Sequence, residues 1–131
     1  MSEGSGPHSV QSFLDFLEPI LERGATFLGA FDNEQLVGVA IVEERFEGNM
    51  AWLVFLHVSA AYRRRGVGTA LWTEAVERAQ EAGSHTIYVS ATPSASAVGF
   101  YLQRGCKLAR PPHAGLLEME PEDVHLVAAI D

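Results

Sequence analysis

The sequence predicts an α/β (α+β) fold in which helices flank a mixed, mostly antiparallel central sheet. Three observations support this prediction. Short apolar segments separated by turn residues occupy the first half of the chain, as in an antiparallel meander. The apolar segments 51–58 and 86–91 enclose a helical pattern, which is the order of a crossover between parallel strands. Before the first strand, apolar residues recur at helical spacing over 10–21.

Length and composition predict one small globular domain. The chain has 131 residues. We expect a single domain over 10–131 and a flexible tail over the small, polar segment 1–9. No apolar run is long enough to span a bilayer, so no membrane partner is expected. The single cysteine, Cys106, can form no internal disulfide, which favours a cytoplasmic location.

Charge narrows the choice of ligand. The net charge of −8 argues against a nucleic-acid partner, because phosphate backbones require a broad basic surface. Three of the nine basic residues nevertheless adjoin at Arg63–Arg65. A local cationic spot on an acidic protein indicates a small anionic ligand rather than a polymer.

The first half of the chain predicts a helix and a three-stranded meander. The helix covers 10–21, and Pro19 inside it favours an end or a kink there. Turn residues at 32–35 and 47–49 separate the strands, which makes them antiparallel neighbours. The expected strands are 26–31, 36–42 and 51–58. The last is apolar on both faces, which favours a central position.

The second half begins with a helix over 66–82 that ends at Gly83, followed by the strand 86–91. A second helix is expected to start with Thr92 as its cap and to run to Gln103. Three further strands are expected, the last two on either side of the turn at 121–123. They are 107–109, 116–119 and 124–130.

The most informative segment follows the central strand. It combines Arg63–Arg65 with the glycines Gly66 and Gly68, and a helix begins there. Helix N-termini offer unpaired N–H groups, glycines allow close approach of the backbone, and arginines donate in pairs to phosphate oxygens. The pattern favours a pyrophosphate site over the alternative, a surface arginine run beside a glycine-tolerant turn. It lacks the lysine of a P-loop, and Leu71 replaces the third glycine of a dinucleotide site.

Two ordered motifs resemble the GNAT superfamily of N-acetyltransferases. The first is Arg63-x-x-Gly66-x-Gly68, preceded by Leu56-x-Val58. The second comprises Ala97, Phe100-Tyr101 and Gly105-Cys106. The resemblance covers 25–130 and is strongest over 53–106. It implies the GNAT acyl-CoA N-acyltransferase fold, here without the usual first strand, because no such strand is evident before Val10.

The resemblance implies acetyl-CoA as co-substrate. The strands 51–58 and 86–91 should splay, with the pantetheine arm between them and the pyrophosphate on the main-chain N–H groups of the arginine-glycine turn. Ser94 stands where the family often has a cofactor-binding asparagine. The implied cofactor-binding residues are Leu56, Val58, Arg63, Arg64, Arg65, Gly66, Val67, Gly68, Thr69, Ser94 and Tyr101.

The implied reaction is transfer of the acetyl group to a primary amine by direct attack in a ternary complex. Tyr101 should protonate the departing thiolate, and the main-chain N–H of Leu56 should bind the oxyanion. The family's base position holds Trp52, which cannot accept a proton. Water leading to bulk solvent is therefore expected to remove the amine proton, with Glu43 and Glu44 as candidates to order it.

The missing base and first strand leave an alternative function, a non-catalytic acyl-CoA-binding regulatory module on the same fold. The acceptor of the enzyme would be a small molecule or peptide amine. An uncovered sheet edge predicts a homodimer that pairs or swaps the strands near 116–130.

The histidines carry no predicted function. Strand alternation turns His57 away from its neighbours Leu56 and Val58, and we interpret it as a packed core residue. His113 and His125 lack partners at metal-ligand spacing, so no metal is expected.

Overall fold

A computed structural model describes residues 10–131, with side chains from residue 14 onward. The predicted tail over 1–9 lies outside the described residues. The elements in chain order are α1 (Val10–Glu22), β1 (Thr26–Asp32), β2 (Gln35–Glu47), β3 (Met50–Val58), the 3-10 helix η1 (Ala60–Tyr62), α2 (Val67–Glu81), β4 (Thr86–Ala91), α3 (Ala95–Gln103), β5 (Lys107–Leu108), α4 (Ala114–Met119) and β6 (Val124–Ala129).

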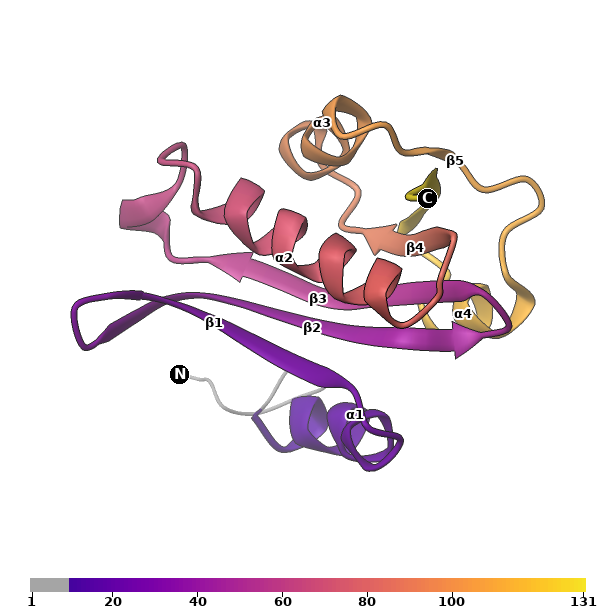
Figure 1. Ribbon diagram of the computed structural model, residues 1–131, viewed down its shortest axis with the longest axis horizontal. Coiled ribbons are helices and arrows are strands. Elements are labelled where there is room, and N and C mark those ends of the chain that lie inside the picture. Colours follow the sequence, from indigo (N-terminus) through magenta and orange to yellow (C-terminus); the bar gives the residue numbers. More distant parts are fainter. Residues whose placement is uncertain (1–9) are drawn as a thin grey trace.

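The strands form one six-stranded sheet in the order β1-β2-β3-β4-β6-β5. β1, β2 and β3 are an antiparallel meander, and the crossover through α2 makes β3 and β4 parallel. β6 pairs antiparallel with both β4 and β5. Figure 1 shows α2 running alongside the central strands. The predicted mixed, mostly antiparallel sheet flanked by helices is confirmed.

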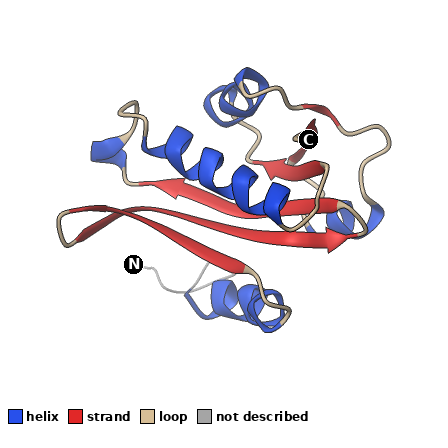
Figure 2. Cartoon of the chain, in the orientation of Figure 1, coloured by secondary structure: helices blue, strands red, loops and turns tan. Residues whose placement is uncertain are grey.

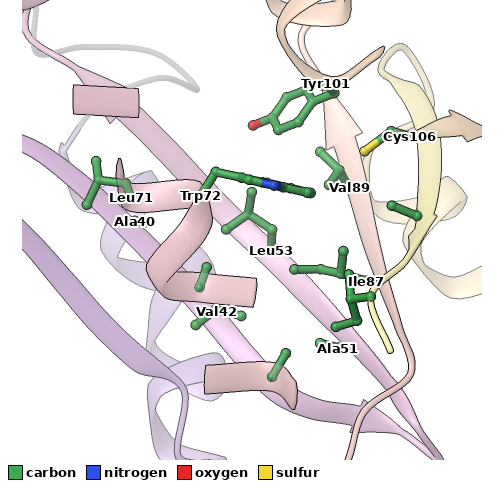
Figure 3. Close-up of a cluster of buried hydrophobic side chains, with 14 of the residues drawn as sticks. Ala40, Val42, Ala51, Leu53, Leu71, Trp72, Ile87, Val89, Tyr101 and Cys106 are labelled. Carbon is green, nitrogen blue, oxygen red and sulfur yellow. The ribbon is translucent and has the colours of Figure 1, made fainter. Parts of the chain in front are cut away.

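Each face of the sheet carries its own hydrophobic cluster. α2 and α3 cover one face, where Trp72 and Tyr101 pack over Leu53 and Val89 (Figure 3). α1 and α4 cover the other face, with Trp52 at the centre of the second cluster. Both clusters exclude water from apolar side chains, which is the main force that holds these helices to the sheet.

A β-bulge interrupts β3. Ile41 of β2 faces Phe55, whereas the next residue, Val42, faces Leu53, so Val54 is an extra residue in β3. A bulge bends its strand and increases the local twist. The bend falls where the two parallel strands part.

Pairing between β3 and β4 stops at Leu53 and Val89. The rest of β3, residues 54–58, pairs only with β2. The main-chain groups of this segment that point toward β4 therefore have no strand partner. The resemblance implies such a splay, and the strand pairing agrees with it.

β1 lies at the edge of the sheet. A strand before α1 would fall within residues 1–9, which lie outside the described residues, so the expected lack of the usual first strand stays a prediction. Among the described residues, no helix combines the length and the apolar character that crossing a membrane requires.

One predicted strand is wrong. Residues 116–119 belong to the helix α4, because His113 caps its start by accepting the N–H of Leu116 on Nδ1 at 3.2 Å. A four-residue apolar pattern fits a strand or a helix equally well, and only the cap decides between them.

Two local predictions at helix ends also need correction. Ser94, rather than Thr92, caps α3, since its Oγ accepts the N–H of Ala97 at 3.1 Å. α1 continues past Pro19 to Glu22. The burial of Leu17 and Ile20 on either side of that proline favours the continued helix, because both side chains pack in the second cluster.

Candidate functional site

A cleft of about 710 Å³ opens between the end of β3, the start of α2 and the length of α3. Figure 2 shows the loop that joins β3 through η1 to α2. Most of the predicted cofactor-binding residues line this cleft. They are Leu56, Val58, Arg63, Arg64, Gly66, Gly68, Thr69 and Tyr101. Two segments far apart in sequence are thus brought together around one cavity.

The turn before α2 leaves the helix N-terminus open. Gly66 is the N-cap residue, and its φ of 84° lies in the left-handed region that glycine adopts without strain. No side chain caps the helix, so no side-chain oxygen occupies the first N–H groups of α2. These donors and the positive end of the helix dipole suit an anion such as pyrophosphate.

Gly68 is required by close packing rather than by its φ angle. A Cβ atom built at this position lies 3.3 Å from Cε1 of Phe100 and 3.7 Å from Cγ2 of Val58. An alanine at this position would therefore require the Phe100 side chain of α3 to shift by a few tenths of an ångström, whereas its contact with Val58 would be ordinary.

The three adjacent arginines have different positions. Arg63 Nε donates to the Val58 carbonyl at 3.2 Å, which ties the turn to the end of β3. Arg64 lines the cleft. Arg65 lies outside the lining, with its guanidinium 5.3 Å from the centre of the Tyr62 ring. Two of these three arginines, Arg63 and Arg64, therefore line the cleft.

Two other predicted binding residues also lie outside the cleft lining. Val67 packs against the α2 face of the sheet. Ser94 serves as the cap of α3, and this hydrogen bond occupies its hydroxyl.

Tyr101 reaches the cleft from α3 and is largely buried. Only 7% of its surface is exposed, and its ring meets Trp72 edge-on at a centroid distance of 5.8 Å. Figure 3 shows the hydroxyl directed away from Cys106. Burial, and to a smaller extent the nearby Cys106 thiol, raises the pKa of Tyr101 well above its ordinary value. The hydroxyl therefore keeps its proton and can donate it.

Glu43 and Glu44 do not line the cleft. Glu43 is buried and accepts a hydrogen bond from Arg23, whose Nη2 lies 2.5 Å from its Oε1. Glu44 accepts the hydroxyl of Thr26 at 2.5 Å. Trp52, which stands at the family's base position, is fully buried, and its ring packs against Phe46.

The interpretation of His57 as a core residue is wrong. His57 is exposed and lines the cleft. Its ring stacks on that of Phe55, with centroids 6.2 Å apart and planes 22° apart. The strand alternation pointed its side chain to the correct face, but the sequence did not show that this end of the face is uncovered.

Arg104 is a cleft residue that the sequence analysis missed. Its guanidinium stacks on Phe100 at 3.8 Å from the ring centre and donates to the Thr69 hydroxyl and to the Phe100 carbonyl. This arginine joins α3 to the first turn of α2. In the sequence, its position directly before Gly105 did not indicate that it would line a cleft.

Among residues 10–131, no group of three or more His, Cys, Asp or Glu side chains could hold a metal ion. His125 is buried in a hydrogen-bonded chain, with Nδ1 2.7 Å from the Tyr88 hydroxyl and Nε2 2.9 Å from the Glu120 carbonyl. His113 lies beside Glu47, at 3.0 Å.

Comparison with known proteins agrees with the resemblance seen in the sequence motifs. The sequence model of the acetyltransferase (GNAT) family matches residues 2–106. No protein with a curated description matches the chain. The solved PaiA N-acetyltransferase of Thermoplasma acidophilum, in complex with coenzyme A, is 21% identical with a TM-score of 0.68, covering 94% of this chain and 72% of that one.

Two further structures are similar. A GNAT-family acetyltransferase of Staphylococcus aureus is 24% identical with a TM-score of 0.74, covering 90% of this chain and 78% of that one. The ribosomal-protein-S18-alanine N-acetyltransferase of Escherichia coli is 20% identical with a TM-score of 0.64, covering 82% and 70%. At these identities the likeness concerns the fold alone.

Proposed function

The chain belongs to the acetyltransferase (GNAT) family, and we propose that it transfers the acetyl group of acetyl-CoA to a primary amine by direct attack in a ternary complex. The observation that carries this proposal is the cleft at the splay of β3 and β4, with the uncapped helix N-terminus on its rim. The cleft combines an anion site with unpaired main-chain groups along one wall.

We assign the pyrophosphate to the main-chain N–H groups of the turn over 64–69. Arg63 and Arg64 add positive charge beside it. The pantetheine arm then runs along the unpaired side of β3, where main-chain groups of Leu56 and Val58 can bond to its amides. Acetyl-CoA supplies an activated thioester, and the protein binds and orients it.

Two groups act on the thioester in this proposal. The Leu56 N–H binds the carbonyl oxygen, whose negative charge grows as the amine attacks. Tyr101 gives its proton to the departing thiolate sulfur. Burial raises the pKa of Tyr101, which keeps the phenol protonated and present as a donor but makes the proton transfer itself less favourable.

A non-catalytic acyl-CoA-binding module is the second candidate. Trp52 at the family's base position and the engagement of Glu43 and Glu44 outside the cleft favour it. Both functions require CoA binding, and only the enzyme releases a thiol.

An amine panel separates the two functions. The purified protein is incubated with acetyl-CoA and with polyamines, aminoglycosides, amino acids and peptides, and free thiol is followed over time. We expect amine-dependent thiol release with at least one class. Calorimetric binding of CoA together with no release on any class would overturn the enzyme and support the module.

We also propose a cytoplasmic location and a homodimer. The buried, unpaired thiol of Cys106 is consistent with a reducing compartment. The expected pairing through 116–130 conflicts with the fold, because 116–119 is helical and β6 lies inside the sheet. Within the described residues, the long edge strand of the sheet is β1, and we transfer the proposed contact to it.

A further inference from the structure

We propose that His57 is the general base that removes the proton from the acceptor amine. This assignment rests on the proposed function and completes it, because neither Tyr101 nor the Leu56 N–H can accept that proton. It also supplies the group that Trp52 cannot provide at the family's base position.

The strand directs His57 to the face opposite Tyr101. Leu56 and Val58 pack with the α2–α3 cluster, and neighbouring residues of a strand alternate between faces. His57 stacks on Phe55, which belongs to the other cluster. The imidazole therefore lies on the α1 side of β3, whereas Tyr101 lies on the α2–α3 side.

The placement of His57 and Tyr101 on opposite faces of the sheet puts the proposed base and the proposed acid on opposite sides of the thioester. The Leu56 N–H that binds the carbonyl oxygen is one residue away from His57 in the chain. Tyr101 is largely buried, so its face offers the amine little access, while His57 is exposed. An amine that approaches from the exposed side meets the imidazole and then the carbonyl carbon, and the thiolate leaves toward the phenol.

The cleft offers no competing base. Among the described residues that line it, no side chain is a carboxylate, and the charged ones are Arg63, Arg64 and Arg104. His57 is the one histidine among these lining residues. Imidazole is the side chain whose ordinary pKa lies near neutral pH, which suits a base that must be restored in every turnover.

The proton balance is complete. The amine arrives as an ammonium ion, and neutral His57 takes one proton from it and later releases this proton to solvent. The free amine then forms the C–N bond, the C–S bond breaks, and Tyr101 protonates the sulfur. A second proton, lost from the nitrogen after bond formation, returns to the Tyr101 oxygen through solvent.

The titratable groups around His57 determine whether a pH profile of the rate can be assigned to His57 itself. Its neighbours on the sheet face are Phe55, Val39 across on β2 and Gly29 beyond on β1, none of which titrates. The described carboxylates of the two helices on this face, α1 and α4, are all exposed: Asp15, Glu18, Glu22 and Glu118. The cleft adds arginines, which stay charged throughout, and Tyr101, whose raised pKa keeps its phenol protonated.

The test is the pH dependence of kcat/KM for the best amine in wild type and His57→Gln. Glutamine keeps a polar side chain of similar length but cannot titrate near neutral pH. We expect kcat/KM at pH 7 to fall about 100-fold and the acidic limb of the wild-type profile to vanish. Acetyl-CoA affinity by calorimetry should stay within about twofold of wild type.

Two controls sharpen the result. His85→Gln removes an exposed histidine outside the cleft, near Asp131 at 3.8 Å, and should leave both rate and pH profile unchanged. Added imidazole should restore part of the rate to His57→Ala and none to Tyr101→Phe.

The outcomes are distinct. An active wild type with an unaffected His57→Gln variant, its acidic limb intact, overturns the assignment and leaves the proposed function standing. A wild type that binds CoA but acetylates no amine overturns both.

Discussion

Gly68 is the residue at which the anion site and the packing of the domain meet. We expect Gly68→Glu to abolish CoA binding while the domain stays folded, because the new side chain crowds Phe100 and places a negative charge beside the pyrophosphate. Calorimetry with CoA measures the loss, and circular dichroism checks the fold. Thr73→Glu, on an exposed position of α2, is the matched charge control. Wild-type CoA affinity in a folded Gly68→Glu protein would show that the pyrophosphate does not bind at this turn.

Tyr101 is the general acid in the proposed reaction. Tyr101→Phe retains the ring that packs on Trp72 and removes only the hydroxyl. We expect kcat to fall about 100-fold while acetyl-CoA affinity stays close to wild type. Pre-steady-state kinetics must first show that chemistry limits the wild-type rate. An unchanged kcat under that condition would leave Tyr101 with a packing role only.

Single residues also show which features of the site the sequence can predict. Arg63, Gly66 and Gly68 all line the cleft, and their binding of the pyrophosphate stays a prediction. His57 was misjudged, since exposure depends on which helix covers the end of a strand. That is decided by tertiary packing and leaves no mark in the local sequence.

Among the elements, α4 depends on a chain of hydrogen bonds to β4 and β6. The His113 N–H donates to the Tyr88 hydroxyl at 3.0 Å, and that hydroxyl lies 2.7 Å from His125 Nδ1. Because His125 Nε2 donates to the Glu120 carbonyl, Nδ1 is the acceptor. The Tyr88 hydroxyl thus joins the start of α4 to β6.

We expect Tyr88→Phe to destabilise the protein by about 1–3 kcal/mol, because it leaves buried partners without a hydrogen bond. Urea unfolding at constant m-value measures the change. Tyr62→Phe, which removes only the exposed contact with Asp32, should have little effect. Equal midpoints for Tyr88→Phe and wild type would show that solvent replaces the lost bonds.

Element types followed from the sequence where the apolar pattern was long. The three strands of the meander, α2 and β4 were predicted within a few residues because each repeats its period several times. α4 was missed because six residues give no clear period, and its cap is a histidine rather than a more usual residue.

For the whole molecule, we propose that the edge strand β1 mediates assembly. Two large apolar side chains on this strand are exposed, Phe27 by 56% and Phe31 by 64%. A second copy pairing β1 with β1 would cover both, and natural sheets seldom leave such edges open. We expect a dimer mass by light scattering at micromolar concentration and a monomer mass for Phe31→Lys. Met119→Lys, on an exposed position of α4, should remain dimeric. A monomeric wild type would refute the proposed contact.

The splay of β3 and β4 also has a consequence for backbone amide hydrogen exchange. The amides of 54–58 that point toward β4 have no strand acceptor, whereas Trp52 and Leu53 pair with strands on both sides. Deuterium should therefore enter the first segment within the shortest labelling times and these two residues only slowly. Saturating CoA should slow exchange in 54–58 by bonding to the same amides, and it should have no such effect in the Gly68→Glu variant. The end of β3 would then acquire in the complex the protection that a continuous sheet provides elsewhere, with the ligand in place of the missing strand neighbour.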